Sequence, residues 1–113
     1  MNALSNSVRL IGNLGKDPVI RTTTNGNTLA SITLATKSFS KDKEGNRTEE
    51  TDWHNLVIWG KQAEIAGKYL KKGSQIAVEG MLKTRKYTDS DGNDKYTTEV
   101  LVGEFQMLGK KPE

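Results

Sequence analysis

Short runs of alternating apolar and polar residues, separated by turn-forming residues, follow one another along most of the chain. The first covers residues 7–15 and ends at Lys16-Asp17-Pro18. The second covers residues 19–24 and ends at Asn25-Gly26-Asn27, a strong hairpin signal. A period of two is typical of β-strands that bury one face. Eleven glycines and two prolines lie mostly between these runs, so the pattern predicts an all-β domain.

The middle of the chain contains two longer runs and one segment with a helical period. Residues 29–39 and 51–59 predict two strands, and the charged stretch 40–50 between them predicts a solvated loop. The apolar residues of 61–72 recur every three or four positions, which predicts a helix. Gly73 follows directly, as is common after a helix C-terminus.

Three further strands are predicted after the helix, at residues 75–87, 95–101 and 105–108, the first two joined through the turn 89–94. The predicted order is several strands, a single helix, two long strands and a closing strand. This is the order of elements in a five-stranded OB-fold barrel with one short helix. We therefore expect an OB-fold domain over residues 1–109 and a short C-terminal end at 110–113.

Length and composition exclude several classes of protein. A chain of 113 residues can build one hydrophobic core but not two domains. Without cysteine it has no disulfide and no thiolate metal site, and no cofactor or metal is expected. The formal net charge of +3 is modest for a protein that binds nucleic acid. The distribution of the cations is therefore more informative than their sum.

The sequence carries no recognisable signal for export or membrane insertion. Residues 1–7 lack the charged and apolar regions of a signal peptide. No apolar run approaches the roughly 20 residues that span a bilayer. We expect a cytoplasmic protein, associated with the nucleoid if its ligand is DNA.

Two tryptophans share one face of the predicted strand 51–59. Counting by two places Trp53 and Trp59 opposite the apolar pair Leu56 and Ile58, which is the obvious core pair. The indoles then point outward about 20 Å apart, a separation that suits several stacked bases. Alternatively, both rings pack beneath a loop or a neighbouring subunit.

Cations and an aromatic ring also share a face of strand 75–87. There Ile76, Val78 and Leu82 mark the buried parity, whereas Lys83, Arg85 and Tyr87 have the opposite one. Cations neutralise phosphates and flat rings stack on any base, so the combination is typical of proteins that follow a single strand. Taken alone, however, this segment is better explained as an exposed strand whose charges only keep the protein soluble. The same pattern recurs, however, at Lys37, Phe39, Trp53, Trp59 and Lys61.

Other candidate sites have better structural explanations. The turn 89–94 resembles a calcium loop, but its glycine comes too early and the acid at the twelfth position is missing. His54 has no Ser or Cys partner, so a structural role in the core or at an interface is expected. Lys71 and Lys72 either complement the helix dipole or contact DNA. Turns, bulges or barrel bends are expected at Gly12, Gly15, Gly60, Gly73 and Gly80.

Six runs, taken in order, resemble the bacterial single-stranded DNA-binding protein family: residues 8–18, 32–36, 51–54, 69–75, 84–87 and 96–100. The resemblance covers nearly the whole chain. It implies an OB fold, usually a homotetramer, that binds single-stranded DNA without base preference. It also implies protection of that DNA during replication, recombination and repair.

The resemblance also implies roles for individual residues. Trp53, Trp59 and Tyr87 match base-stacking positions. Basic positions along the DNA path are matched by Arg21, Lys61, Lys71, Lys72, Arg85 and Lys86, to which the shared faces add Lys37 and Lys83. His54 matches a position associated with subunit assembly. The first strand, with Asn6, Val8 and Leu10, falls where the family pairs subunits edge to edge.

Two features depart from the family pattern. Family members place an aromatic residue near the end of the third strand, where this chain is one residue short; either Phe39 fills that position or Ser40 leaves it empty, and we favour Phe39. Members also carry a Gly/Pro/Gln-rich linker and an acidic C-terminal tip, whereas this sequence stops at Glu113. The resemblance therefore gives little support for recruitment of other proteins through a tail.

The resulting hypothesis is a DNA-binding protein without enzymatic activity, whose partners are single-stranded DNA and further copies of the chain. The nearest alternative is an OB-fold module that binds RNA or acts in primosome assembly. A nuclease would need clustered acids, and the acids here scatter over loops and turns. A purely structural oligomer would use the shared faces as its interface.

Overall fold

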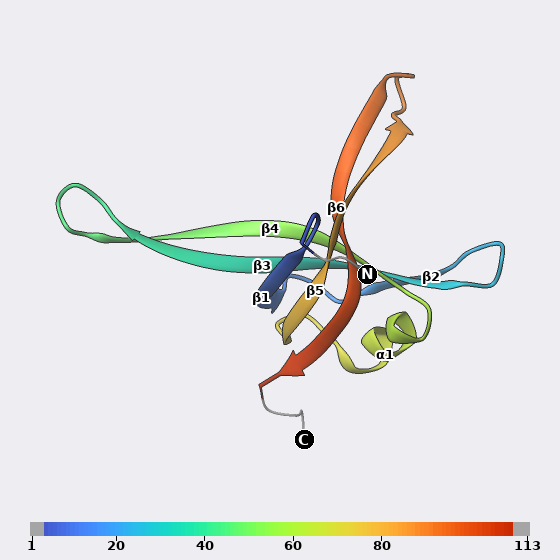
Figure 1. The fold of residues 1–113 in the computed structure, drawn as a ribbon, viewed down its shortest axis with the longest axis horizontal. Helices are drawn as coiled ribbons and strands as arrows, with labels where there is room; N and C mark the ends of the chain where they lie inside the picture. The colour runs from blue at the N-terminus through green and yellow to red at the C-terminus, as the bar shows by residue number, and fades with distance from the viewer. Residues whose placement is uncertain (1–3, 110–113) are drawn as a thin grey trace.

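The computed structural model describes residues 4–109 and contains six strands and one helix (Figure 1). In chain order these are β1 (Val8–Leu14), β2 (Val19–Thr22), β3 (Thr28–Lys41), β4 (Arg47–Trp59), α1 (Lys61–Tyr69), β5 (Gln75–Thr88) and β6 (Asp94–Leu108).

Five of the strands close into a barrel. Their spatial order is β1-β5-β6-β4-β3, and β1 pairs again with β3 through Asn13 and Leu14. β6 runs parallel to β4, and they pair only at Leu56 with Val100 and at Val57 with Leu101. β2 pairs with the start of β3 and extends the sheet. This closed barrel with one helix is the OB fold that the order of the elements predicts.

The core is formed by every second residue of the barrel strands, as the alternation requires. Its buried members are Leu14, Ala30, Ile32, Leu34, Leu56, Ile58, Ile76, Val78, Val100 and Val102, joined by Ala63, Ala66 and Leu70 from the helical segment. The helix ends at Tyr69 instead of residue 72, because Leu70 adopts an extended conformation and is buried. Within residues 4–109, no helix has the length and apolarity that a membrane span requires.

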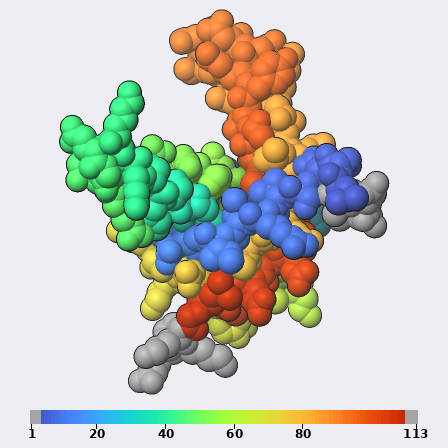
Figure 2. All heavy atoms as spheres, turned by 60° about the vertical axis from the view of Figure 1, so that its left-hand side comes forward, coloured from blue at the N-terminus to red at the C-terminus, as the bar shows by residue number. Residues whose placement is uncertain are grey.

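Two hairpin arms project from the barrel (Figures 1 and 2). We call them the β3–β4 arm (residues 36–52) and the β5–β6 arm (residues 82–99). The radius of gyration is 16.2 Å, against about 13 Å for a compact chain of this length. The arms account for the difference. Leu82, assigned to the buried parity, is 50% exposed because it lies beyond the barrel.

The predicted loop 40–50 is wrong, because β3 and β4 stay paired as far as Lys41 and Arg47. Only residues 42–46 form the turn, where the Asp42 carboxylate accepts the backbone N–H groups of Glu44 and Asn46 at 2.9 and 2.8 Å. Residues 40–50 of the arm have no core to face, so they are polar on both faces. The alternation that marks a strand is therefore hidden.

The predicted break between strands 95–101 and 105–108 is also wrong, since β6 is one strand with a bulge. β5 pairs with β6 on both sides of Gly103, which has no partner of its own. The bulge shifts the parity, so the core contact passes from Val102 to Phe105. The alternation of buried and exposed residues changes phase at the bulge. The sequence pattern therefore predicted two strands where the structure has one.

Barrel closure requires a residue without a side chain at position 12. A Cβ atom on Gly12 would collide with the backbone oxygen of Ala35 on β3. Gly12→Ala should therefore lower the free energy of unfolding by about 1–3 kcal/mol, measured by urea denaturation.

Gly103→Ala is the matched control, because a Cβ there would meet only the Glu79 oxygen at an ordinary 3.6 Å. Equal midpoints for the two variants would contradict the assigned close approach.

Candidate nucleic-acid interface

The strand register brings the predicted aromatic and basic residues of three strands onto one face. Directly paired residues lie on the same side of a sheet. β3–β4 pairing therefore places Trp53 beside Ala35 and Trp59 beside Leu29, and β2–β3 pairing places Arg21 beside Leu29 as well. We call this the outer face; it also carries Ser31, Thr33, Lys37, Phe39, Asn55 and Val57.

The aromatic rings are accessible to a ligand. Trp53 is 60% exposed and Trp59 is 44% exposed, so both indoles point outward as predicted. The Trp53 ring lies against Gly15, where an added Cβ atom would collide with it. The backbone of Gly15 thus forms a platform for one side of the indole, and the rest of the ring remains exposed.

A groove of about 250 Å³ joins the outer face to the β5–β6 arm. Its lining comes from β2, β3, β4, the arm and the turn after β1, and it includes Arg21, Asn55, Arg85 and Lys16. Lys16 and Arg21 from the start of the chain and Arg85 from the β5–β6 arm thus converge on one depression. Lys16 was not among the predicted site residues, because a turn has no parity from which its direction could be inferred.

An ion pair orients the cation that the β5–β6 arm contributes to the groove. The Nε atom of Arg85 lies 3.0 Å from a carboxylate oxygen of Glu99. The Glu99 side chain is only 16% exposed, whereas that of Arg85 is 60% exposed. The carboxylate therefore holds the guanidinium at the groove while leaving its other N–H groups free for a phosphate.

On the β3–β4 arm, the outer face carries Phe39 and not Ser40. Phe39 pairs with Glu49 and shares the parity of Trp53, and its ring is 54% exposed. The guanidinium carbon of Arg47 lies 4.2 Å from the ring centroid, a cation–π contact that covers part of the ring. The structure thus supports Phe39 for the aromatic position.

Further cations lie on the same face of the β3–β4 arm. Lys37 forms an ion pair with Glu49 at 3.3 Å, and Lys41 and Arg47 face each other at the end of the arm. Sequence reasoning missed these last two because it assigned them to a loop.

Three of the four predicted residues on the β5–β6 arm lie on its groove side. Lys83 and Tyr87 share the parity of Arg85, and Tyr87 is 44% exposed. Lys86 has the opposite parity and points away from the groove, paired with Tyr96. Lys86 therefore does not share a face with Arg85, and its predicted contact with DNA stays a prediction.

The remaining predicted cations flank the site. Lys61 is the first residue of α1, and Lys71 and Lys72 lie in the loop after it. The loop is held near Lys16, because the Lys72 backbone N–H donates to the Asp17 carboxylate at 2.8 Å. All three lysines are exposed, and none of them lines the groove.

The predicted interface residues lie along β1 and at the barrel rim. The Asn6 side chain bonds both the N–H and the oxygen of Leu82, at 2.8 and 3.0 Å, and Val8 and Leu10 pack partly against the core. His54 Nε2 lies 2.9 Å from the Thr36 hydroxyl. β1 pairs with β5 along one edge, and on its other edge residues 8–12 have no partner strand within residues 4–109.

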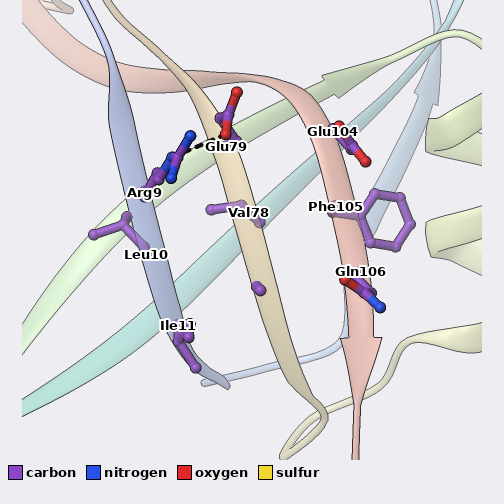
Figure 3. Close-up of a pocket in the computed structure, with 9 residues that line it drawn as sticks. Arg9, Leu10, Ile11, Val78, Glu79, Glu104, Phe105 and Gln106 are labelled. Atoms are coloured by element: carbon purple, nitrogen blue, oxygen red, sulfur yellow. Dashed lines mark ion pairs between the residues drawn. The ribbon is translucent and has the colours of Figure 1, made fainter.

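A second hollow, of about 540 Å³, lies on the face of β1, β5 and β6 (Figure 3). Its charged residues are one arginine and two glutamates: Arg9 pairs with Glu79 at 2.9 Å, and Glu104 lies beside them. This excess of carboxylate does not suit a polyanion. Among residues 4–109, no three His, Asp or Glu side chains gather to hold a metal ion.

Residues 5–108 match the sequence profile of the Single-strand binding protein family. The chain belongs to this family. Single-stranded DNA-binding protein 1 of Xylella fastidiosa is 51% identical over 109 residues, which are 96% of this chain and 80% of that protein. A single-stranded DNA-binding protein of Xanthomonas campestris is also 51% identical, but this chain spans only 63% of its length.

Solved structures of the family have the same fold. The Plasmodium falciparum SSB, solved in complex with single-stranded DNA, superimposes with a TM-score of 0.85 at 32% identity, covering 96% of this chain and all of that chain. A deletion mutant of the Thermus aquaticus single-stranded DNA-binding protein gives a TM-score of 0.81 at 34% identity. That match covers 92% of this chain and 50% of the other.

The contact between Trp53 and Gly15 gives a test of the site without any ligand. Gly15→Ala should push the indole off its platform and into solvent, and so shift its fluorescence emission to longer wavelength. Trp59 is the only other tryptophan, so the spectra are compared in a Trp59→Phe background. Unchanged emission would show that the ring does not rest on Gly15.

Proposed function

We propose that this protein binds single-stranded DNA without sequence specificity, along the outer face and the groove. The observation that carries the proposal is the convergence of exposed aromatic rings and cations from separate strands onto one surface. The family match, and the DNA bound to the Plasmodium structure, support it.

The interface has two kinds of contact with different chemistry. Trp53, Trp59, Tyr87 and Phe39 offer flat surfaces on which any base can stack, because every base has a π-face. Arg21, Lys37, Lys83 and Arg85 neutralise phosphates and release the counterions bound to them. Neither contact reads the hydrogen-bonding edge of a base, so the binding does not depend on sequence.

Protection of exposed single strands during replication, recombination and repair follows from such binding. The protein acts by covering the strand and not by catalysis. We also propose that it acts as an oligomer, a tetramer in keeping with its family. The unpaired edge of β1 supports this, since another copy can pair with it, and Ile11 on the same strand is 61% exposed.

Tryptophan fluorescence gives the direct test of DNA binding. Saturating poly(dT) at low salt should quench the emission, since both tryptophans lie on the proposed path. Trp53→Ala should weaken binding at every salt concentration, by about fivefold or more, the value of one stacked base. Unchanged emission together with no mobility shift would refute the function.

Two arginines in similar ion pairs allow the phosphate contacts to be tested separately. Arg85 pairs with Glu99 at the groove, and Arg9 pairs with Glu79 on the other hollow. Arg85→Ala should flatten the slope of log K against log salt by about 0.7, the value for one phosphate contact on a single strand. Arg9→Ala should leave the slope as it is. Equal slopes for all three proteins would remove Arg85 from the path.

A further inference from the structure

The β5–β6 arm carries the same pair of side chains, a tyrosine opposite a lysine, on each of its two faces. Tyr87 pairs with Lys95 on the groove side, and Tyr96 pairs with Lys86 on the reverse side. Tyr96 is 70% exposed, more than any other aromatic residue within residues 4–109. No packing role accounts for a ring so fully exposed.

The β3–β4 arm shows what a face unsuited to nucleic acid looks like. Its reverse side carries Thr36, Ser38 and Ser40 from β3 and Thr48, Glu50 and Asp52 from β4. It therefore has two carboxylates, no lysine or arginine and no aromatic ring, and it repels a polyanion. The reverse side of the β5–β6 arm differs, since it offers an aromatic ring and a cation together.

We infer that the reverse face of the β5–β6 arm is a second binding site for single-stranded nucleic acid, in which Tyr96 stacks on a base and Lys86 contacts a phosphate. The inference rests on the proposed function. It extends the path of the strand beyond the groove to the reverse face, where the resemblance implied a DNA contact for Lys86 but none for Tyr96.

The shape of the arm allows a strand to reach this face. β1 pairs with β5 only as far as Gly80, and β4 pairs with β6 only at Val100 and Leu101, so no further strand pairs with either edge of the arm within residues 4–109. The arm is two strands wide, with about 5 Å between neighbours. A strand that leaves the groove past Tyr87 can therefore pass round one edge and meet Tyr96. Figure 2 shows the arm standing clear of the body.

The cation on the reverse face is available to a phosphate. Lys86 lies 3.1 Å from the Asp94 carboxylate, and both side chains are 56% exposed. Ion pairs between side chains this exposed contribute little stability. A phosphate that arrives with a stacked base can therefore replace the carboxylate as the partner of Lys86.

The test compares dT oligomers of increasing length. Tyr96→Val removes the ring, while valine, a β-branched residue, keeps the strand propensity of the position. The variant should bind short oligomers, which fill only the groove, as tightly as the wild type does. Above the length that reaches the reverse face, its affinity should be about fivefold lower, the effect of one lost stack. Its occluded site should also be shorter.

Two control substitutions sharpen the comparison. Tyr96→Phe keeps a stacking ring and should bind every length as the wild type does. Tyr69→Val removes an exposed tyrosine of α1, a helix that lies away from the β5–β6 arm (Figure 1), and should have no effect at any length. Thermal midpoints of all variants check that the arm remains folded.

The outcomes separate this inference from the proposed function. If the wild type fails to bind dT at any length, both are wrong. If the wild type binds and Trp53→Ala weakens binding, but Tyr96→Val matches the wild type at every length, only the second site is refuted. A Tyr96→Val protein with unchanged DNA affinity and a lower molecular mass by light scattering would refute it too, and would assign the face to protein contacts.

Discussion

The buried ladder between β3 and β4 determines where the functional side chains of this protein point. Ile32 pairs with Leu56 and Ala30 with Ile58, and all four are buried. A slip of one residue in this register would move the whole apolar set to the solvent, so the core permits only one alignment. Because the ladder continues without interruption into the β3–β4 arm, that alignment also decides which face of the arm is cationic and which is acidic.

The groove depends on a second constraint, the close approach of β5 and β6 where they leave the barrel. A Cβ atom on Gly80 would collide with the backbone of Leu101, and the bulge at Gly103 lies next to it. Bulges bend strands and increase their twist. The bend brings Arg85 and Glu99 to the groove that Asn55 and Arg21 line. Interactions in the barrel wall thus place a cation that lies well outside the core.

Where strands bury one face with an unbroken period of two, the sequence predicted the fold and the direction in which the candidate site residues point. Alternation placed Trp53 and Trp59 outward, and the order of the elements predicted the barrel. Prediction failed where no core imposes a parity, as in residues 40–50, and where the bulge at Gly103 shifts it. Lys16 was missed because the direction of a turn side chain depends on tertiary packing. Lys86 was assigned by resemblance alone, and counting from Arg85 would have placed it on the opposite face.

Ion pairs on the outer face and on the groove side of the β5–β6 arm position the cations of a chain whose net charge is only +3. Glu99 and Glu49 hold Arg85 and Lys37 in place before any ligand arrives. Each carboxylate also competes with a phosphate for its cation, so every single contact yields only a small net gain. The total affinity must then come from many weak contacts, shared between charge and stacking. A strand held in this way can detach segment by segment, because no single contact dominates its release.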